Sequence, residues 1–473
     1  MGVIVNDLHS ELNESEVAEI IEVDSLEAIR AGIARARELG VPVSVAGGRY
    51  AMGGQQFCSG GIVLDTRKLN RVLDLDNERG FVQVEAGIQW PELIDHLETA
   101  QAGLSVQWAI AQKQTGADRI SIGGTISANA HGRGLTMKPF ISDVESLVLV
   151  NPNGETVECS RDSNNKLFRL VAGGYGLFGC IYSVTLRLTQ RQILERVVEL
   201  EEIDNLAKRF NERISDGFLY GDFQFMTDDK AEGFMRTGVF SCYRPIEREP
   251  PPDQQELSLD DWMNLITLAH TDKKLAFKVY SEHYLATSGQ IYNSDRHQLA
   301  DYLDGYHRRL DEIMGIMHRA SEMISELYVP REKLAEFMTA AAEDFKKHNV
   351  DVIYGTIRLI ERDDESFLAW ASQSWACVIF NLHIVHTPDG IEQSAEAFRR
   401  LIDLAIECSG TYYLTYHRWA NREQVEKCYP QLRQFLDLKR EYDPEELFQS
   451  DWYRHYRDMF FGALTQAYCE QTD

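Results

Sequence analysis

The chain has 473 residues, of which 44% are hydrophobic and 26% are charged, and 48 Lys and Arg against 74 Asp and Glu give a net charge of −26. This length favours two domains over a single core, and the composition is typical of a water-soluble globular protein. The negative charge argues against binding to nucleic acid or to anionic membranes, since both require clustered Lys and Arg.

The N-terminal residues and the cysteines predict a cytoplasmic protein. The first 17 residues contain no basic segment followed by an apolar one, so we expect no secretion signal. No stretch approaches 18 apolar residues, so we expect no membrane span. The eight cysteines are scattered without a C-x-x-C pair, which favours reduced thiols over disulfides or a zinc site.

A helix and a strand precede the first glycine-rich segment. Asp24 and Glu27 match a capping box with Asp24 as the N-cap, and the helical spacing that follows ends at Gly40. The sequence VPVSVA at 41–46 predicts a buried strand that leads into AGGRYAMGG at 46–54.

This glycine-rich segment does not match a Rossmann site, because a Rossmann loop opens directly onto a helix. Here residues 61–65 and 81–87 predict strands, residues 76–80 predict a turn, and the next helix begins near Gln89. Loop amides would therefore have to bind phosphate groups. The alternative is a purely structural glycine-rich turn.

Two further segments, at 115–134 and 171–188, are also rich in small residues, and we expect each to join short strands. Three such segments in the first 190 residues indicate that backbone lines one long, flat, phosphorylated ligand from several sides.

Together these motifs resemble those of the flavoproteins of the vanillyl-alcohol oxidase type, which carry a PCMH-type FAD-binding domain. The resemblance covers roughly residues 15–190 strongly and the end of the chain moderately. The matching segments occur in the order AGGRYAMGG at 46–54, VEAGIQWPEL at 84–93, SIGGTISANAHGRG at 121–134, DVESLVLVNPNGE at 143–155, AGGYGLFGCIYSVTLRL at 172–188 and KREYDPEELFQSDWYRHY at 439–456.

The resemblance implies an α+β fold in three parts. Residues 1–190 would form the PCMH-type FAD-binding domain, made of two α+β subdomains with the cofactor between them. Residues 191–419 would form an α+β cap domain whose antiparallel sheet covers the flavin, and residues 420–473 would return to the FAD domain.

The same motifs imply which residues contact FAD. The pyrophosphate would meet Gly47, Gly48, Arg49, Tyr50, Ala51 and Met52. The ribityl chain and the flavin would meet Ser121, Gly123, Gly124, Ser127, Asn129 and His131, and the cofactor site would also include Thr115 and Gly116. The adenine half would be supported by Gly173, Gly174, Gly176 and Ile181.

Tyr50 and His131 need separate interpretation. Many relatives have a histidine in the first loop that is bonded covalently to the flavin, and this chain has Tyr50 there. The segment SIGGTISANAHGRG lacks the cysteine of bicovalent members, and Cys58 lies elsewhere, so we predict noncovalent FAD. A tyrosyl–flavin ether is the alternative. For His131 we favour a structural, flavin-facing role over substrate contact.

The cap region has a different composition. Residues 218–228, 233–245, 351–363, 375–388 and 410–420 predict strands, and residues 325–349 predict a strand followed by a helix from near Arg331. Residues 247–261 predict an exposed, proline-rich connection, and residues 258–310 are mixed and rich in Tyr and His.

Three cap segments offer catalytic candidates, because flavin accepts the hydride while the protein must orient the substrate and handle the proton. Arg358 alternates with Ile357 and Leu359, so it can face a pocket, although an ion pair at the cap edge is the alternative. His383 shares a face with Asn381, although a hydrogen-bonded structural histidine is the alternative.

The third segment, YLTYHRWA, lies where relatives place a substrate-contacting base or cation. Here the candidates are Tyr416, His417 and Arg418, and Tyr416 and Arg418 share a face unless the strand has ended. For the pair Tyr292 and Asp295 we favour a structural role over a functional one. The histidines show no metal-binding spacing, so we expect no catalytic metal.

The resemblance implies an FAD-dependent oxidase or dehydrogenase that transfers hydride from a C–OH, C–N or C–C bond of a small or medium organic substrate to noncovalent flavin. Oxygen or another acceptor would then reoxidise the flavin. Relatives include alditol, sugar-lactone and decaprenyl-phosphoryl ribose oxidases and sterol reductases, so the fold does not identify the substrate. The alternatives are a flavin-dependent reductase, a redox-neutral isomerase, or a flavin-binding scaffold.

Overall fold

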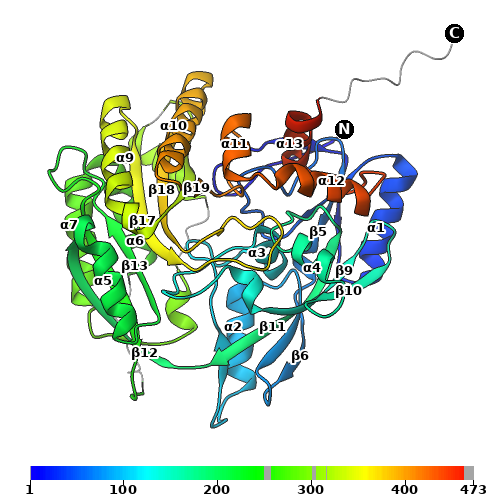
Figure 1. Ribbon diagram of the computed structural model, residues 1–473, viewed down its shortest axis with the longest axis horizontal. Coiled ribbons are helices and arrows are strands. Elements are labelled where there is room, and N and C mark those ends of the chain that lie inside the picture. The colour runs from blue at the N-terminus through cyan, green and yellow to red at the C-terminus, as the bar shows by residue number, and fades with distance from the viewer. Residues whose placement is uncertain (1, 250–256, 301–304, 316, 463–473) are drawn as a thin grey trace.

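The computed structural model describes residues 2–249, 257–300, 305–315 and 317–462. Helices and largely antiparallel sheets are combined, which confirms the predicted α+β class. Figure 1 shows two lobes, with the N-terminal strands at the right and the later strands at the left. Among the described residues, no helix is both long and apolar enough to cross a membrane.

The first lobe contains a small parallel sheet in the order β3 (Glu19–Glu22), β5 (Ile62–Asp65), β4 (Val43–Ala46), with α1 (Leu26–Leu39) beside β5. The predicted N-cap of α1 was wrong by one residue. Ser25 is extended and its hydroxyl accepts from the Ala28 amide at 3.2 Å, whereas Asp24 only accepts from the Ser25 hydroxyl.

The second sheet of this lobe has the order β10-β9-β11-β7-β6, with β8 paired to β11. Its helix α2 (Trp90–Ala100) begins after Gln89, as predicted. The second glycine-rich segment does more than join strands, because it forms helix α3 (Ile122–Ala128), whose first turn is capped by the Ser121 hydroxyl. The remaining elements of the lobe are β1 (Val3–Val5), β2 (Ser15–Val17), β6 (Val72–Asp76), β7 (Phe81–Glu85), β8 (Trp108–Ile110), β9 (Val144–Val150), β10 (Thr156–Ser160), α4 (Asn165–Val171) and β11 (Cys180–Gln190).

The described residues of the second lobe form an eight-stranded antiparallel sheet in the order β15-β12-β14-β13-β17-β18-β16-β19. The strands are β12 (Ile193–Glu202), β13 (Tyr220–Phe225), β14 (Thr237–Pro245), β15 (Ile291–Asn293), β16 (Ala320–Val329), β17 (Val352–Ile360), β18 (Trp375–Val385) and β19 (Thr411–Tyr412). Helices α5 (Ile203–Ser215), α9 (Leu334–His348) and α10 (Pro388–Glu407) pack on this sheet through aromatic side chains such as Phe210 and Phe345.

The helix expected near Arg331 is confirmed, since a 3₁₀ turn over Arg331–Lys333 continues directly into α9 from Leu334. Two other predictions for this lobe need correction. The strand expected over 410–420 is only the two-residue β19. The proline-rich connection lies partly outside the described residues, and its end, from Leu259, already belongs to a helix. Between β14 and β16 the described residues form three further α-helices, α6 (Leu259–Thr271), α7 (Lys273–Ala286) and α8 (Tyr306–Met314).

The C-terminal helices α11 (Arg422–Cys428), α12 (Leu432–Tyr442) and α13 (Asp451–Phe461) return toward the first lobe (Figure 1). The amide of Val43 in β4 donates to the Leu447 carbonyl at 2.7 Å. The Trp452 ring of α13 lies 4.7 Å from the Tyr175 ring, and its amide donates to the Gly54 carbonyl. The tail therefore closes over the strand and the loop that carry the first glycine-rich segment.

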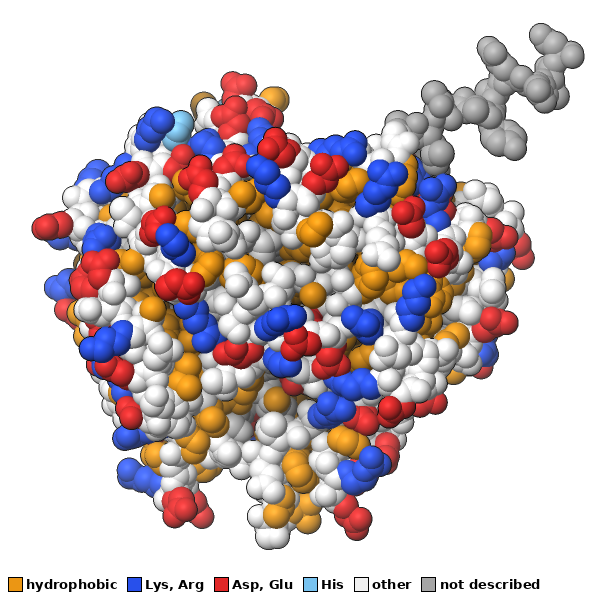
Figure 2. All heavy atoms as spheres, viewed as in Figure 1, with side chains coloured by type: hydrophobic (Ala, Val, Ile, Leu, Met, Phe, Trp, Pro, Cys, Tyr) orange, Lys and Arg blue, Asp and Glu red, His pale blue; other side chains and the backbone are white. Residues whose placement is uncertain are grey.

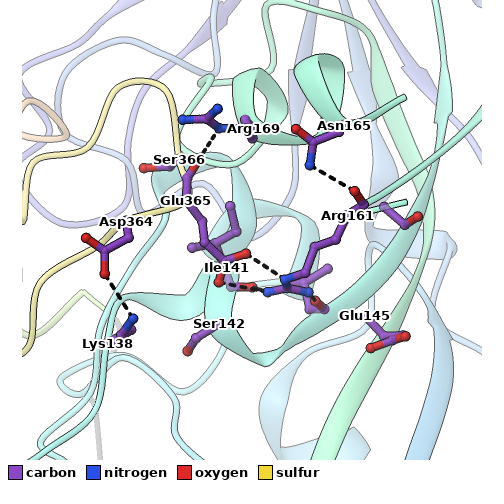
Figure 3. Close-up of polar contacts among 12 residues, drawn as sticks. Lys138, Ile141, Ser142, Glu145, Arg161, Asn165, Arg169, Asp364, Glu365 and Ser366 are labelled. Carbon is purple, nitrogen blue, oxygen red and sulfur yellow. Dashed lines mark hydrogen bonds and ion pairs between the residues drawn. The ribbon is translucent and has the colours of Figure 1, made fainter. Parts of the chain in front are cut away.

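The loop between β17 and β18, in the second lobe, forms hydrogen bonds and ion pairs with the first lobe (Figure 3). The Arg161 guanidinium forms a 2.6 Å ion pair with Glu365 and donates to the Ile141 carbonyl. Arg169 donates to the Glu365 carbonyl at 2.6 Å, and Lys138 approaches Asp364 at 3.2 Å. These charged hydrogen bonds fix the cap sheet relative to the glycine-rich segments.

Candidate active site

A cavity of about 890 Å³ lies where the two lobes meet, and its volume falls within the range of ligand pockets, roughly 300–1,000 Å³. The glycine-rich segments line one part of it and the cap sheet lines the other. The predicted cofactor residues that line it are Gly47, Gly48, Arg49, Tyr50, Ala51, Met52, Thr115, Gly116, Ser121, Gly123, Gly124, Ser127, His131, Gly176 and Ile181.

The first glycine-rich loop needs its glycines for close packing. A Cβ on Gly47 would lie 2.1 Å from the Ser121 hydroxyl, and a Cβ on Gly48 would lie 2.3 Å from the Arg119 carbonyl oxygen. The amides of Gly48 and Ala51 have no acceptor among the described residues. Such free amides form a concave site for an anion, which fits the pyrophosphate of FAD.

Neighbouring groups support this assignment of the pyrophosphate to the loop. The first amides of α3, those of Ile122 and Gly123, already donate to the carbonyls of Ile88 and Ala86, so they are not available to a phosphate group. The buried Thr115 hydroxyl lines the cavity and has no partner among the described residues, so a ligand can satisfy it. The residues present therefore fit FAD.

Three predicted FAD contacts, Asn129, Gly173 and Gly174, do not line the cavity. The side-chain amide of Asn129 donates to the Asp363 carboxylate at 2.9 Å, and its side-chain carbonyl accepts from the Ile141 amide, so both ends of this side chain have protein partners. Gly173 has φ +75°, and a Cβ on Gly174 would lie 2.1 Å from the Leu170 carbonyl oxygen. Both glycines shape the turn behind the cofactor site.

The cap sheet presents polar side chains to the cavity at every second residue. In β17, Thr356 and Arg358 line the cavity, while Ile357 and Leu359 belong to the hydrophobic core on the other face. Arg358 is 7% exposed, and its Nε has no hydrogen-bond partner among the described residues. A buried guanidinium with a free donor is suited to bind a substrate oxygen.

Glu326 of β16 is the centre of a buried hydrogen-bond network at this cavity. Its carboxylate lies 2.6 Å from His131 Nε2 and accepts from the hydroxyls of Tyr328 at 2.5 Å and Tyr416 at 2.9 Å, and from the Cys377 thiol at 3.3 Å. Burial alone would raise the pKa of Glu326, but the charge of His131 and these hydrogen bonds lower it to about 2. The carboxylate is therefore ionised at neutral pH and positions both His131 and Tyr416.

The structure separates the five predicted catalytic residues. Arg358 and Tyr416 line the cavity, whereas His383, His417 and Arg418 do not. The alternation assumed for residues 416–418 fails because β19 ends at Tyr412.

The three residues outside the cavity have other neighbours. The His417 ring stacks on Trp419 at 4.3 Å, and Arg418 lies beside Gly54. His383 lies on the same face of β18 as Asn381, which lines the cavity, but its ring packs 5.2 Å from that of His270 in α6. The buried carboxylate of Asp295 forms a 2.7 Å ion pair with Arg191.

Sequence reasoning missed Glu322 and Glu326, which both line the cavity. They lie four residues apart in the otherwise mainly apolar strand β16, with Ile324 between them on the same face. Two carboxylates on one face of such a strand are unusual, because burying ionised groups is costly. This pattern of two acidic residues in an apolar strand could have identified Glu322 and Glu326 from the sequence.

Two buried histidines predict a loss of stability in mild acid. Burial lowers the pKa of both His307 and His417 to about 4, whereas the unfolded chain titrates near the ordinary value. Between the two values the unfolded state binds more protons, so each histidine removes up to about 3 kcal/mol from the free energy of unfolding as the pH falls. Asp143, whose pKa burial raises to about 6, offsets part of this loss.

Urea denaturation at several pH values between 7 and 4.5 measures the effect. As the pH is lowered, we expect the urea concentration at the transition midpoint to fall in the wild type. Measured as the difference from each protein's own midpoint at pH 7, the fall should be smaller in a His417→Asn variant. Parallel curves for the two proteins would refute the assignment to His417.

Comparisons with known proteins identify two matched regions. Residues 17–160 match the family model described as an FAD binding domain, and residues 310–456 match the one described as D-arabinono-1,4-lactone oxidase. The chain is 24% identical to an L-gulono-1,4-lactone dehydrogenase of Mycobacterium tuberculosis, over 84% of this chain and 86% of that protein. It is 24% identical to the L-gulonolactone oxidase of Mus musculus, over 90% of this chain and 92% of that protein.

A third relative is a mitochondrial L-galactono-1,4-lactone dehydrogenase of Oryza sativa, which is 25% identical over 79% of this chain. The match spans 65% of the rice protein, just under two thirds of its length. The cavity described above joins the two matched regions, since its lining comes from residues in both.

Proposed function

Because the chain belongs to the oxidoreductases with a PCMH-type FAD-binding domain, a family that includes sugar-lactone oxidases, we propose that it oxidises an alcohol carbon of a small polyhydroxylated molecule. The observation that carries the proposal is the shared cavity, in which Arg358 and the Glu326–Tyr416 pair of the cap meet the FAD-binding segments. When bound, FAD supplies the hydride acceptor.

The cap residues would prepare the alcohol for hydride loss. The substrate hydroxyl would lose its proton to solvent, and the Arg358 guanidinium would stabilise the alkoxide that forms, from whose carbon the hydride then leaves. The Tyr416 hydroxyl donates to Glu326, so its oxygen remains available to accept from a substrate hydroxyl. Burial raises the pKa of Tyr416 well above 10, so it acts as an orienting group that keeps its own proton.

The test is turnover of a panel of aldono-1,4-lactones and alditols, followed both as peroxide in air and as reduction of a dye acceptor. We propose both readouts because the similar proteins are named as oxidases and as dehydrogenases. Turnover of at least one panel member supports the proposal. Flavin reduction by NAD(P)H without turnover of any alcohol would instead favour a reductase.

We also propose that FAD is held without a covalent bond. Tyr50 lines the cavity in the first loop, and Cys58, whose side chain is fully buried, does not. Acid precipitation of the purified protein should therefore release the flavin to the supernatant, because denaturation removes every noncovalent contact. Colour that stays in the pellet would show a covalent link, and a Tyr50→Phe variant would then identify whether Tyr50 forms it.

We further propose a cytoplasmic protein whose FAD-binding, cap and returning segments divide near residues 190 and 419. The seven cysteines among the described residues form no disulfide, and separate sheets lie on either side of residue 191, which supports both proposals.

A further inference from the structure

Two further arginines line the cavity. Arg196 lies on β12 of the cap sheet, whereas Arg133 lies within the SIGGTISANAHGRG segment of the first lobe and approaches Asp222 of β13 at 3.5 Å. Their guanidinium carbons lie 5.2 and 5.0 Å from the centre of the Tyr243 ring. Arg196 donates to the Tyr243 hydroxyl at 2.8 Å and to the Thr287 hydroxyl at 3.0 Å, so its neighbours hold its orientation without neutralising its charge.

The charges on this part of the lining do not balance. Among the described residues, no carboxylate lies within 4 Å of Arg196 or Arg358, and Asp222 is the only one that close to Arg133. The two acids of β16 are already paired, Glu322 with His270 at 2.9 Å and Glu326 with His131. Arg133 and Arg196 are both partly buried and, within the described ranges, only Arg133 has a carboxylate nearby. Removing a cation from water without a compensating negative charge is costly, which indicates that an anion completes the site.

Two other arginines of the lining, Arg49 and Arg296, are neutralised by close carboxylates, unlike Arg196 and Arg358. Arg49 pairs with Asp65 at 2.8 Å, and Arg296 pairs with Asp95 at 2.6 Å. His297 lines the cavity beside Arg133 and is 4% exposed, and neither of its ring nitrogens has a hydrogen-bond partner among the described residues. A buried polar side chain without a partner marks a position where a ligand is expected to bind.

The positive lining contrasts with the rest of the molecule. The chain carries a net charge of −26, and acidic and basic side chains are interspersed over the face shown in Figure 2. The pyrophosphate of FAD does not explain the pair, because the free amides for it lie in the loop at 47–52 and Arg196 belongs to the cap sheet.

We propose that the substrate is an anion, a polyhydroxylated molecule whose carboxylate or phosphate monoester binds between Arg133 and Arg196 while its alcohol carbon is oxidised. This inference rests on the proposed function and narrows its substrate class. Arginine suits either group, since its planar donors match carboxylate and phosphate oxygens.

Titration of the FAD-loaded protein with inorganic phosphate and with D-gluconate tests the site, with the flavin absorbance and the melting temperature as readouts. We expect saturable binding in the wild type and at least tenfold weaker binding in Arg196→Gln. The control is Arg244→Gln, because Arg244 is a half-exposed arginine on the adjacent strand that pairs with Glu195, and it should bind like the wild type. Tighter binding of phosphate or of gluconate identifies which group the substrate carries.

Asp222→Asn changes the site in the opposite direction. Removal of the nearest carboxylate should tighten phosphate binding several-fold, an effect that a misfolded variant would not produce. In turnover, Arg196→Gln should raise KM for an anionic substrate at least tenfold and leave kcat within threefold. Equal anion binding by the wild type, Arg196→Gln and Asp222→Asn would overturn the inference. Turnover of neutral lactones would still support the proposed function in that case, so the two failures are distinguishable.

Discussion

Arg358→Met is expected to slow flavin reduction by substrate about 10²–10³-fold, because the alkoxide from which the hydride leaves would lose a preorganised donor, and one such donor to an oxyanion contributes roughly that factor. Methionine keeps the apolar stem and the packing of a side chain that is 7% exposed, and only the charge and its donors are lost. FAD content should stay unchanged, because the cofactor segments do not depend on Arg358. Stopped-flow measurement of flavin reduction under anaerobic conditions gives the rate directly.

The matched control for this variant is Arg331→Met. Arg331 pairs with Glu361 at 2.8 Å, close to the end of the same strand, and it does not line the cavity. Its variant should reduce flavin at the wild-type rate, and added guanidinium ion should restore part of the rate of Arg358→Met alone. A rate for Arg358→Met within threefold of the wild type would remove this residue from the mechanism.

Glu326→Gln is expected to lower the rate of flavin reduction about 10²-fold, because a misplacement of about 1 Å in a group that contacts the substrate, here Tyr416, can cost that factor. The amide keeps the shape of the carboxylate but turns one acceptor into a donor, which then faces the donors of His131, Tyr328 or Tyr416. His131 also loses the buried negative charge beside it.

A double-mutant cycle distinguishes positioning from general destabilisation. If Glu326 acts by orienting Tyr416, Tyr416→Phe should slow the reaction, and combining it with Glu326→Gln should add little further loss. Glu361→Gln, which alters a carboxylate outside the cavity, serves as the control. Fully additive losses would show that the two residues act independently.

The sequence predicted the features that depend on local backbone chemistry. Glycine-rich segments indicate close backbone packing. The short distances at Gly47 and Gly48 show why a residue with a side chain cannot replace either glycine. Alternation along β17 was enough to predict that Arg358 faces away from the core, and the structure places it in the cavity lining. The α+β class and the FAD assignment followed from the same motifs.

The features missed depend on contacts between distant parts of the chain. Glu326 contacts His131, which lies 195 residues away in the sequence, and no local sequence pattern predicts that contact. His383 shares a face with Asn381, yet α6 covers its end of the strand. Asn129 lies within a cofactor motif, but its side chain bonds Asp363 of a cap loop. Periodicity gives the face on which a side chain lies, and tertiary packing decides what meets it.

Anaerobic mixing of the purified, FAD-loaded full-length chain with aldono-1,4-lactones, alditols and their anionic counterparts tests most directly whether this cavity is an alcohol-oxidising flavin site. One FAD per chain should bleach in a saturable reaction with at least one of these alcohols, and Arg358→Met should bleach far more slowly. Correctly folded protein that binds no FAD, or flavin that none of these alcohols reduces, would contradict it.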